Sequence, residues 1–415
     1  MAFFELTHPT RIIPDFPLAN IVLAAFTGVV LIIDHRNVRL PRVPWTVVTY
    51  LALCTASVLW SINRSDTLHL TLLYAWIALF AAICVAQTDT QTLLRGIAWG
   101  GVLVVVVTLI SVVVDPKRFG SGLLFPGIGP GVHGTKGVVA YSVVLALTAA
   151  LMRKPLGRRS WIDIIFTLAV LAVGLIVASA STGRMGAACV LAGWLVVRLL
   201  RPLRGRALVR GWLIVGVGTA AIAITAVIAR DWITARLGEK SDFNGRYAIW
   251  RAVIDGWLEA PVGGHGFGAV WFYGWWRLDG SPVLDRMNAA AHLDFFHGHN
   301  IFLDILPQLG VLGLVVAILI IGVLAYRGAA GLPGSSSAPG WALLVLVAVL
   351  VMGVAEPMLS VPVGWFSIVA ATTASGRRHR ARMNPGASAA PVANPGHDRL
   401  RREMPSSTPN GRKTP

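Results

Sequence analysis

Residues 93–114 read LLRGIAWGGVLVVVVTLISVVV, an apolar run in which Arg95 is the one charged side chain. An α-helix rises about 1.5 Å per residue, so a run of this length crosses the ~30 Å hydrocarbon layer of a bilayer. Lipid offers no partners for backbone amides and carbonyls, and a helix satisfies them internally. The stretch therefore predicts a membrane-spanning helix.

Similar runs recur along the whole chain of 415 residues, of which 55% are hydrophobic and 13% charged, with a mean hydropathy of +0.68. A transmembrane barrel would instead alternate apolar and polar residues with a period of two. We therefore predict an all-α, polytopic integral membrane protein with about 11 spans, within a range of about 10–12. The expected spans lie near 14–33, 43–62, 67–87, 93–114, 137–152, 161–178, 184–200, 211–229, 300–326, 340–356 and 359–374.

The basic loops predict the orientation of the spans. Arginine and lysine concentrate in the loop around Arg36, in residues 153–160 and 198–210, and in the C-terminal tail. If the number of spans is odd, all of these lie on one side, which the positive-inside rule makes cytoplasmic. The same rule accounts for the net charge of +17, so nucleic acid is not an expected partner.

Four regions follow from this pattern. Residues 1–229 are expected to form an N-terminal membrane bundle of about eight spans, and residues 230–299 an external loop with amphipathic helices. Residues 300–375 hold the C-terminal spans, and residues 376–415 form a disordered, basic, cytoplasmic tail.

The external loop contains one clear helical period, in residues 244–258. Its expected apolar face consists of Trp250, Val253, Ile254, Trp257 and Leu258. Asp242 or Asn244 can cap the start of this helix, which we expect to lie against the outer leaflet.

Two arginines stand at the outer ends of predicted helices. Arg184 follows a small polar turn, where an arginine is ordinarily a residue that extends to the membrane interface. Arg246 lies in the first turn of the amphipathic helix, where a cation opposes the helix macrodipole unless an anion binds beside it. The glycine-rich run 261–268, which contains His265, follows no strand, so we interpret it as a turn rather than a nucleotide loop.

A pair of histidines precedes the ninth expected span. His297 and His299 could bind a metal, but no nearby cysteine or carboxylate pair completes a site, so neither a metal nor a cofactor is predicted. A histidine at a wet helix end can act as a base near neutral pH. Two guanidinium groups and a histidine on one face suit a diphosphate leaving group and an acceptor hydroxyl, which a lipid-linked sugar donor would bring together.

These residues also resemble a known family. His299-Asn300, nine residues, and Gly310-Val311-Leu312-Gly313 fit the H-[NSQ]-x9-G-x-x-G pattern of bacterial O-antigen ligases. The arrangement from Arg184 through Gly245-Arg246 to the glycine-rich turn resembles the wider O-antigen ligase and polymerase superfamily, and Trp60-Ser61 and His133 to Lys136 are weaker landmarks. Where the family ordinarily has Lys-Asn, this chain has Lys136-Gly137.

The resemblance implies a GT-C-like membrane fold and a metal-independent, inverting glycosyltransferase in the bacterial cytoplasmic membrane. It would take an oligo- or polysaccharide from a polyprenyl diphosphate and pass it to a lipid or glycan acceptor on the outer face. Arg184 and Arg246 would bind the diphosphate, and His299 would activate or position the acceptor. We take Lys136, His265, Asn300 and Glu356 as candidate substrate-binding residues.

Several alternatives stay open on the sequence. Ligase and repeat-unit polymerase share these residues, although the histidine pattern favours a ligase. A transporter of lipid-linked sugars would place ionisable groups at mid-membrane depth, where the predicted spans have few. Glu356 either assists His299 or caps the turn before Pro357.

Overall fold

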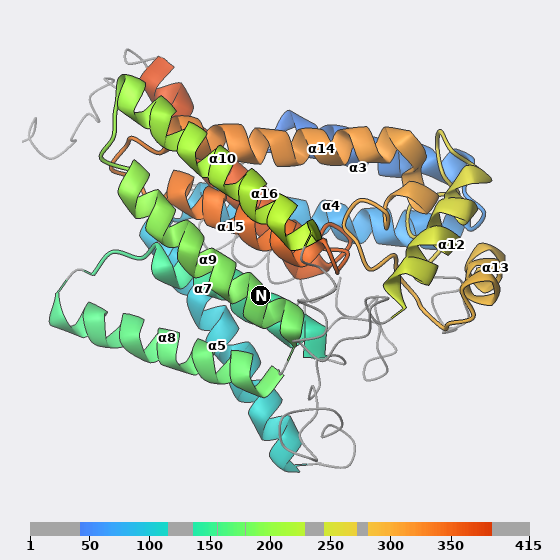
Figure 1. The fold of residues 1–415 in the computed structure, drawn as a ribbon, viewed down its shortest axis with the longest axis horizontal. Coiled ribbons are helices and arrows are strands. Elements are labelled where there is room, and N and C mark those ends of the chain that lie inside the picture. Colours follow the sequence, from blue (N-terminus) through green and yellow to red (C-terminus); the bar gives the residue numbers. More distant parts are fainter. Residues whose placement is uncertain are drawn as a thin grey trace, which may run out of the picture. The chain divides into compact units, whose positions relative to one another are not determined.

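The computed structural model describes residues 42–114, 136–155, 157–178, 180–228, 245–271 and 281–383 (Figure 1). Within these ranges the fold is all-helical. The elements are α3 (Trp45–Ala56), η1 (Ser57–Leu59), α4 (Arg64–Gln87), α5 (Thr90–Val114), α7 (Lys136–Leu151), α8 (Arg158–Ala178), α9 (Ser181–Leu200), α10 (Gly205–Ile228), α12 (Arg246–Leu258), α13 (Pro282–Ala291), α14 (Leu306–Gly331), α15 (Ala338–Gly353) and α16 (Pro362–Met383).

The predicted span at 14–33 lies outside the described residues, and each of the other predicted spans overlaps one of these helices. Among the described helices, 5 are long and apolar enough to cross a membrane, namely α4, α5, α8, α9 and α14. The segments Trp45–Leu59, Val139–Leu151 and Ala338–Gly353 are shorter apolar helices. The chain is therefore a multi-pass membrane protein.

Two helices, α7 and α15, form the buried centre of the bundle. α7 packs against α5, α8, α9 and α15, and α15 also packs against α9 and α14. Within them, residues 139–150 and 338–345 are buried throughout. A helix that is apolar on all sides belongs inside a bundle, whereas α8 and α10 expose many large apolar side chains, as helices that face lipid do.

A separate small core forms between α12 and α13, beyond the ends of α3, α4 and α14 (Figure 1). The predicted helix in the external loop is confirmed, but its predicted apolar face is wrong by one position. The buried residues of α12 are Ile249, Ala252, Val253 and Gly256. Small residues at 252 and 256 let α13 approach closely, because a Cβ on Gly256 would lie 2.6 Å from Sδ of Met287.

Three predicted boundaries also differ from the structure. The N-cap of α12 is Gly245, with φ 83°, and not Asp242 or Asn244. The ninth span begins at Leu306 rather than at Asn300. Oδ1 of Asn300 accepts hydrogen bonds from the amides of Phe302 and Leu303, and these bonds form a turn instead of a helix. α16 continues to Met383, so residues 376–383 of the expected tail are helical, and residues 384–415 lie outside the described part of the chain.

The glycine-rich turn 261–268 fixes the start of α14. Gly310 interrupts α14 with φ 60° and ψ −158°, a conformation open essentially to glycine alone. The amide of Val311 donates to the carbonyl of Pro261 at 2.9 Å across this interruption. A Cβ on Gly310 would lie 2.2 Å from the carbonyl oxygen of Val262, so the two segments touch backbone to backbone.

We therefore expect Gly310→Ala to destabilise the protein by about 3 kcal/mol or more, because it combines a forbidden conformation with a backbone overlap. Gly322→Ala is the matched control on the same helix, where an added Cβ meets nothing within 4 Å and a methyl group favours the helix slightly. Thermal unfolding of the detergent-purified variants measures both effects. Equal melting temperatures for the two variants would contradict this account of the turn.

Candidate active site

Arg246 is the first residue of α12 and follows Gly245, which has a left-handed conformation. Its Nη2 lies 3.9 Å from Oε1 of Glu356. Its Nε is buried and has no hydrogen-bond partner. The first amides of a helix also lack partners within the helix and attract anions. A guanidinium with a spare N–H therefore stands beside an electropositive helix end.

His299 sits at the corner of the turn that leads into α14, with φ 46°. Its carbonyl accepts a hydrogen bond of 3.4 Å from Nε1 of Trp250, and its amide donates to Nδ1 of His297 at 3.2 Å. The Nδ1 atom of His299 lies 4.0 Å from Oε2 of Glu356 and is buried with no hydrogen-bond partner. A left-handed, non-glycine residue is costly, and such residues cluster at functional sites.

Glu356 joins these two residues. It lies between α15 and α16, its side chain is 13% exposed, and one oxygen faces Arg246 while the other faces His299. The hydroxyl of Tyr141, from α7, donates a hydrogen bond to the same carboxylate. Of the two alternatives left open by the sequence, these contacts favour the one in which Glu356 assists His299.

This chain has Gly137 where the family ordinarily has asparagine, and the difference affects Tyr141. A Cβ at this position would lie 2.6 Å from the hydroxyl oxygen of Tyr141. The side chain of an asparagine would occupy this space. Glycine at 137 thus leaves room for the hydroxyl of Tyr141 to reach Glu356.

The electrostatics of the cluster keep His299 neutral. Burial and the charge of Arg246 lower the pKa of His299 to about 4. A hydrogen bond to the backbone of Ala355 raises this pKa but only partly opposes the shift. Burial raises the pKa of Glu356, while Tyr141 and Arg246 oppose that shift. At neutral pH the histidine is therefore an imidazole with a lone pair available, the form that a general base requires.

Asp304 holds the turn in place and is a site residue that the sequence analysis missed. It is fully buried, and Oδ1 accepts from the amide of Gly298 at 2.8 Å. Oδ2 accepts from Oγ of Ser360 at 2.5 Å and from Nε2 of Gln308 at 3.0 Å. Burial raises its pKa to about 6. A carboxylate inside an apolar run shortly after the histidines was the signal that could have revealed it.

Arg184 lies at the same end of the bundle, at the start of α9. It is an exposed residue in the first turn of α9. The preceding Gly183 packs against α7, where its Cβ would lie 2.6 Å from that of Ala140, the neighbour of Tyr141. Lys136 is the first residue of α7, and its side chain is not described.

From Gly264 onward, the amides of the glycine-rich turn are already occupied. Those of residues 264–269 donate to carbonyls, to a serine hydroxyl or to the side chain of Gln308. A phosphate-binding loop needs free amides, so this turn is a structural joint rather than a nucleotide loop. Nor is it a plain flexible turn, because Trp60 and Ser61 both contact it.

Two predicted substrate-binding residues make structural contacts. Nε2 of His265 lies 3.1 Å from the carbonyl oxygen of Gly256, which ties the glycine-rich turn to α12. Nδ2 of Asn300 donates to the carbonyl of Val354 at 3.2 Å, which ties the histidine turn to the end of α15. Both residues position the cluster.

The cluster also contains three potential metal ligands. Ligand atoms of His297, His299 and Glu356 all lie within 4.8 Å of one another. The third of these ligands, Glu356, comes from far along the chain and not from the neighbourhood of the histidine pair. The guanidinium of Arg246, 3.9 Å from Glu356, repels a bound cation and favours an anion in the same place.

A comparison with known protein families covers the middle of the chain. Residues 167–318, which include Arg184, Arg246 and His299, match the family model described as O-antigen ligase. This match confirms, over these residues, the resemblance drawn from the sequence.

The chain is also similar to exopolysaccharide production protein ExoQ of Rhizobium meliloti (strain 1021), with 23% identity over 270 residues. The alignment covers 64% of this chain and 60% of that protein's length.

Proposed function

We propose that this protein is an O-antigen ligase-like glycosyltransferase. It moves an oligo- or polysaccharide from a polyprenyl diphosphate to an acceptor on the outer face of the bacterial cytoplasmic membrane. The observation that supports this most directly is the cluster of Arg246, Glu356 and His299 at the ends of membrane helices. Two of its buried nitrogen atoms have no partner, which is costly unless a ligand supplies one.

The reaction we propose is a single displacement. The acceptor oxygen bonds to the anomeric carbon as the bond from that carbon to the diphosphate oxygen breaks, so the configuration inverts. Arg246, the first amides of α12 and Arg184 stabilise the charge that develops on the diphosphate. His299 takes the proton of the acceptor hydroxyl, and Glu356 orients the ring and stabilises its charged form.

No step in this mechanism needs a metal, so we expect full transfer activity after treatment with EDTA. The reason is that Arg184 and Arg246 supply the positive charge that a metal would otherwise provide. Added Zn²⁺ should not raise the rate, because the guanidinium of Arg246 repels a cation at His299 and Glu356. A strict requirement for a divalent cation in the purified enzyme would contradict the mechanism.

The repeat-unit polymerase reaction is the second candidate. It uses the same donor and the same chemistry, with a second polyprenyl-linked chain as acceptor. The similarity to a protein named for exopolysaccharide production favours it.

The test is transfer by the purified protein in proteoliposomes that contain a polyprenyl-diphosphate-linked glycan. Release of the polyprenyl diphosphate with a glycosylated acceptor supports the proposal. The mass of the product separates the candidates, since a polymerase yields a ladder of repeats on polyprenyl diphosphate. Transport of the donor without release of the diphosphate would overturn both.

A further inference from the structure

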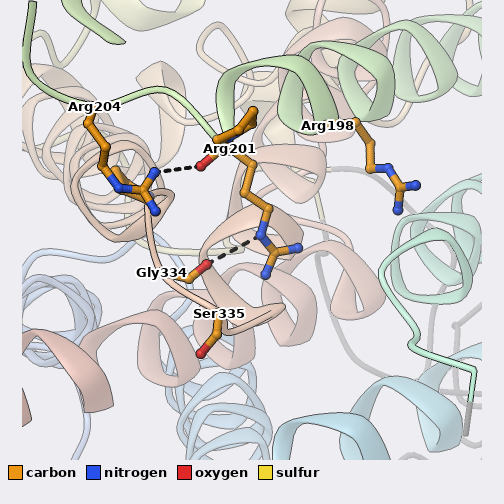
Figure 2. Close-up of a pocket in the computed structure, with 7 residues that line it drawn as sticks. Arg198, Arg201, Arg204, Gly334 and Ser335 are labelled. Carbon is orange, nitrogen blue, oxygen red and sulfur yellow. Dashed lines mark hydrogen bonds between the residues drawn. The ribbon is translucent and has the colours of Figure 1, made fainter.

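A second basic site lies at the other end of α9. That helix has 20 residues, which is about 30 Å, and it carries Arg184 in its first turn. At its far end, Arg198, Arg201 and Arg204 line a pocket of ≈380 Å³ together with Pro202 and residues 333–335 of the α14–α15 connection (Figure 2). The pocket is thus about a membrane thickness away from Arg184.

Neutral groups hold these arginines in place. Arg201 donates from Nη2 to the carbonyl of Ser336 at 2.7 Å and from Nε to that of Gly334 at 3.3 Å. Arg204 donates to the carbonyl of Arg201 at 2.8 Å (Figure 2). Carbonyl oxygens position guanidinium groups but do not neutralise them, so the full positive charge stays at the pocket.

No acidic side chain in the described part of the chain forms an ion pair with Arg198, Arg201 or Arg204. Burial and the charge of Arg198 both lower the pKa of Arg201, as expected where like charges are uncompensated. Lys154 adds a further cation, since its Nζ donates to the carbonyl of Ser335 at 2.6 Å. Such a pocket calls for an anion with several acceptor oxygens.

The surroundings of the pocket indicate where that anion comes from. Two leucines at this end of α9 are exposed. Leu195, about one turn before Arg198, is 54% exposed, and Leu199, next to Arg198 in the sequence, is 62% exposed. Large exposed apolar side chains on a membrane helix face acyl chains. Basic pockets between membrane helices are common binding sites for anionic lipid headgroups.

We propose that this pocket binds the phosphate group of an anionic membrane lipid. Arg198 and Arg204 contact the phosphate oxygens, Arg201 fixes the floor of the pocket against residues 334–336, and the acyl chains lie along Leu195 and Leu199. The bound lipid joins the end of α9 to the α14–α15 connection.

Binding to the detergent-purified full chain tests this proposal by native mass spectrometry with phosphatidylglycerol, phosphatidylcholine and inorganic phosphate. The wild type should retain phosphatidylglycerol in preference to phosphatidylcholine. The variant Arg198→Gln/Arg204→Gln should lose about tenfold or more in affinity. The matched control is Arg206→Gln/Arg210→Gln, which removes the same charge from exposed positions of α10 that do not line the pocket. It should stay within about twofold of the wild type.

Three results would overturn the proposal. They are equal losses in the two double variants, equal binding of phosphatidylcholine, or displacement of the lipid by millimolar inorganic phosphate. The first would indicate a diffuse basic surface, the second a neutral headgroup, and the third a site for free phosphate.

Discussion

Glycan transfer is expected to fall by about a hundredfold to a thousandfold when Arg246 is replaced by alanine, because removing one preorganised group that stabilises charge in a transition state has effects of this size. The diphosphate gains negative charge as its bond to the sugar breaks. Arg246 is the charged group that the structure places at the N-terminus of α12, with Nε buried and without a partner. The measurement is the rate of polyprenyl diphosphate release by purified protein in proteoliposomes.

Two controls separate charge from geometry. Arg246→Lys keeps a cation but loses the planar fork, so we expect partial activity and weaker donor binding. Arg251→Ala removes an exposed arginine from the same helix and should leave the rate within about twofold. If Arg246→Ala keeps the wild-type rate while the folded protein is intact, the diphosphate role assigned to this end of α12 is wrong.

Hydropathy was sufficient to predict the helices of the bundle, because membrane thickness and backbone hydrogen bonding leave few options for an apolar run. It was less reliable at helix ends. The turn before Leu306 depends on the hydrogen bonds of Asn300, and local side-chain capping competes with helix formation in a way that hydropathy does not measure.

The buried face of α12 shows a second limit. Trp257 and Leu258 are more apolar than Ala252 and Gly256, yet the smaller pair faces the core of α12 and α13. Close approach of Met287 selects small residues there. Burial in this case depends on the shape of a partner helix that the sequence of α12 does not contain.

Arg246, His299 and Glu356 could be proposed as site residues from the sequence, but whether Glu356 assists His299 or caps a turn could not be decided there. Glu356 lies far along the chain from both, and only the packing of α15 and α16 brings it within 4.0 Å of His299. Asp304 was missed for a related reason, since its role depends on contacts with Gly298 and Ser360 across two turns. Residues that act through long-range contacts carry little local signal.

The acid side of the pH–rate profile should belong to His299 and should differ between the free and the substrate-bound enzyme. Its pKa is lowered to about 4 by burial and by Arg246. The neutral ring is the base, so activity is present above this pKa and is lost as the pH falls through it. The pH profile of kcat/KM reports the free enzyme, and its acid limb should have a midpoint at about pH 4.

The profile of kcat reports the substrate-bound enzyme, and its acid limb should lie at higher pH. A bound diphosphate offsets the charge of Arg246 and so favours the imidazolium form of His299. Glu356→Gln removes a negative charge near Nδ1 and should move both limbs to lower pH. His299→Ala should abolish the limb and reduce kcat by about a hundredfold to ten-thousandfold, with donor binding retained. An acid limb that persists unchanged in His299→Ala would assign the base to another residue, because a purely structural histidine would change the rate without shaping its pH dependence.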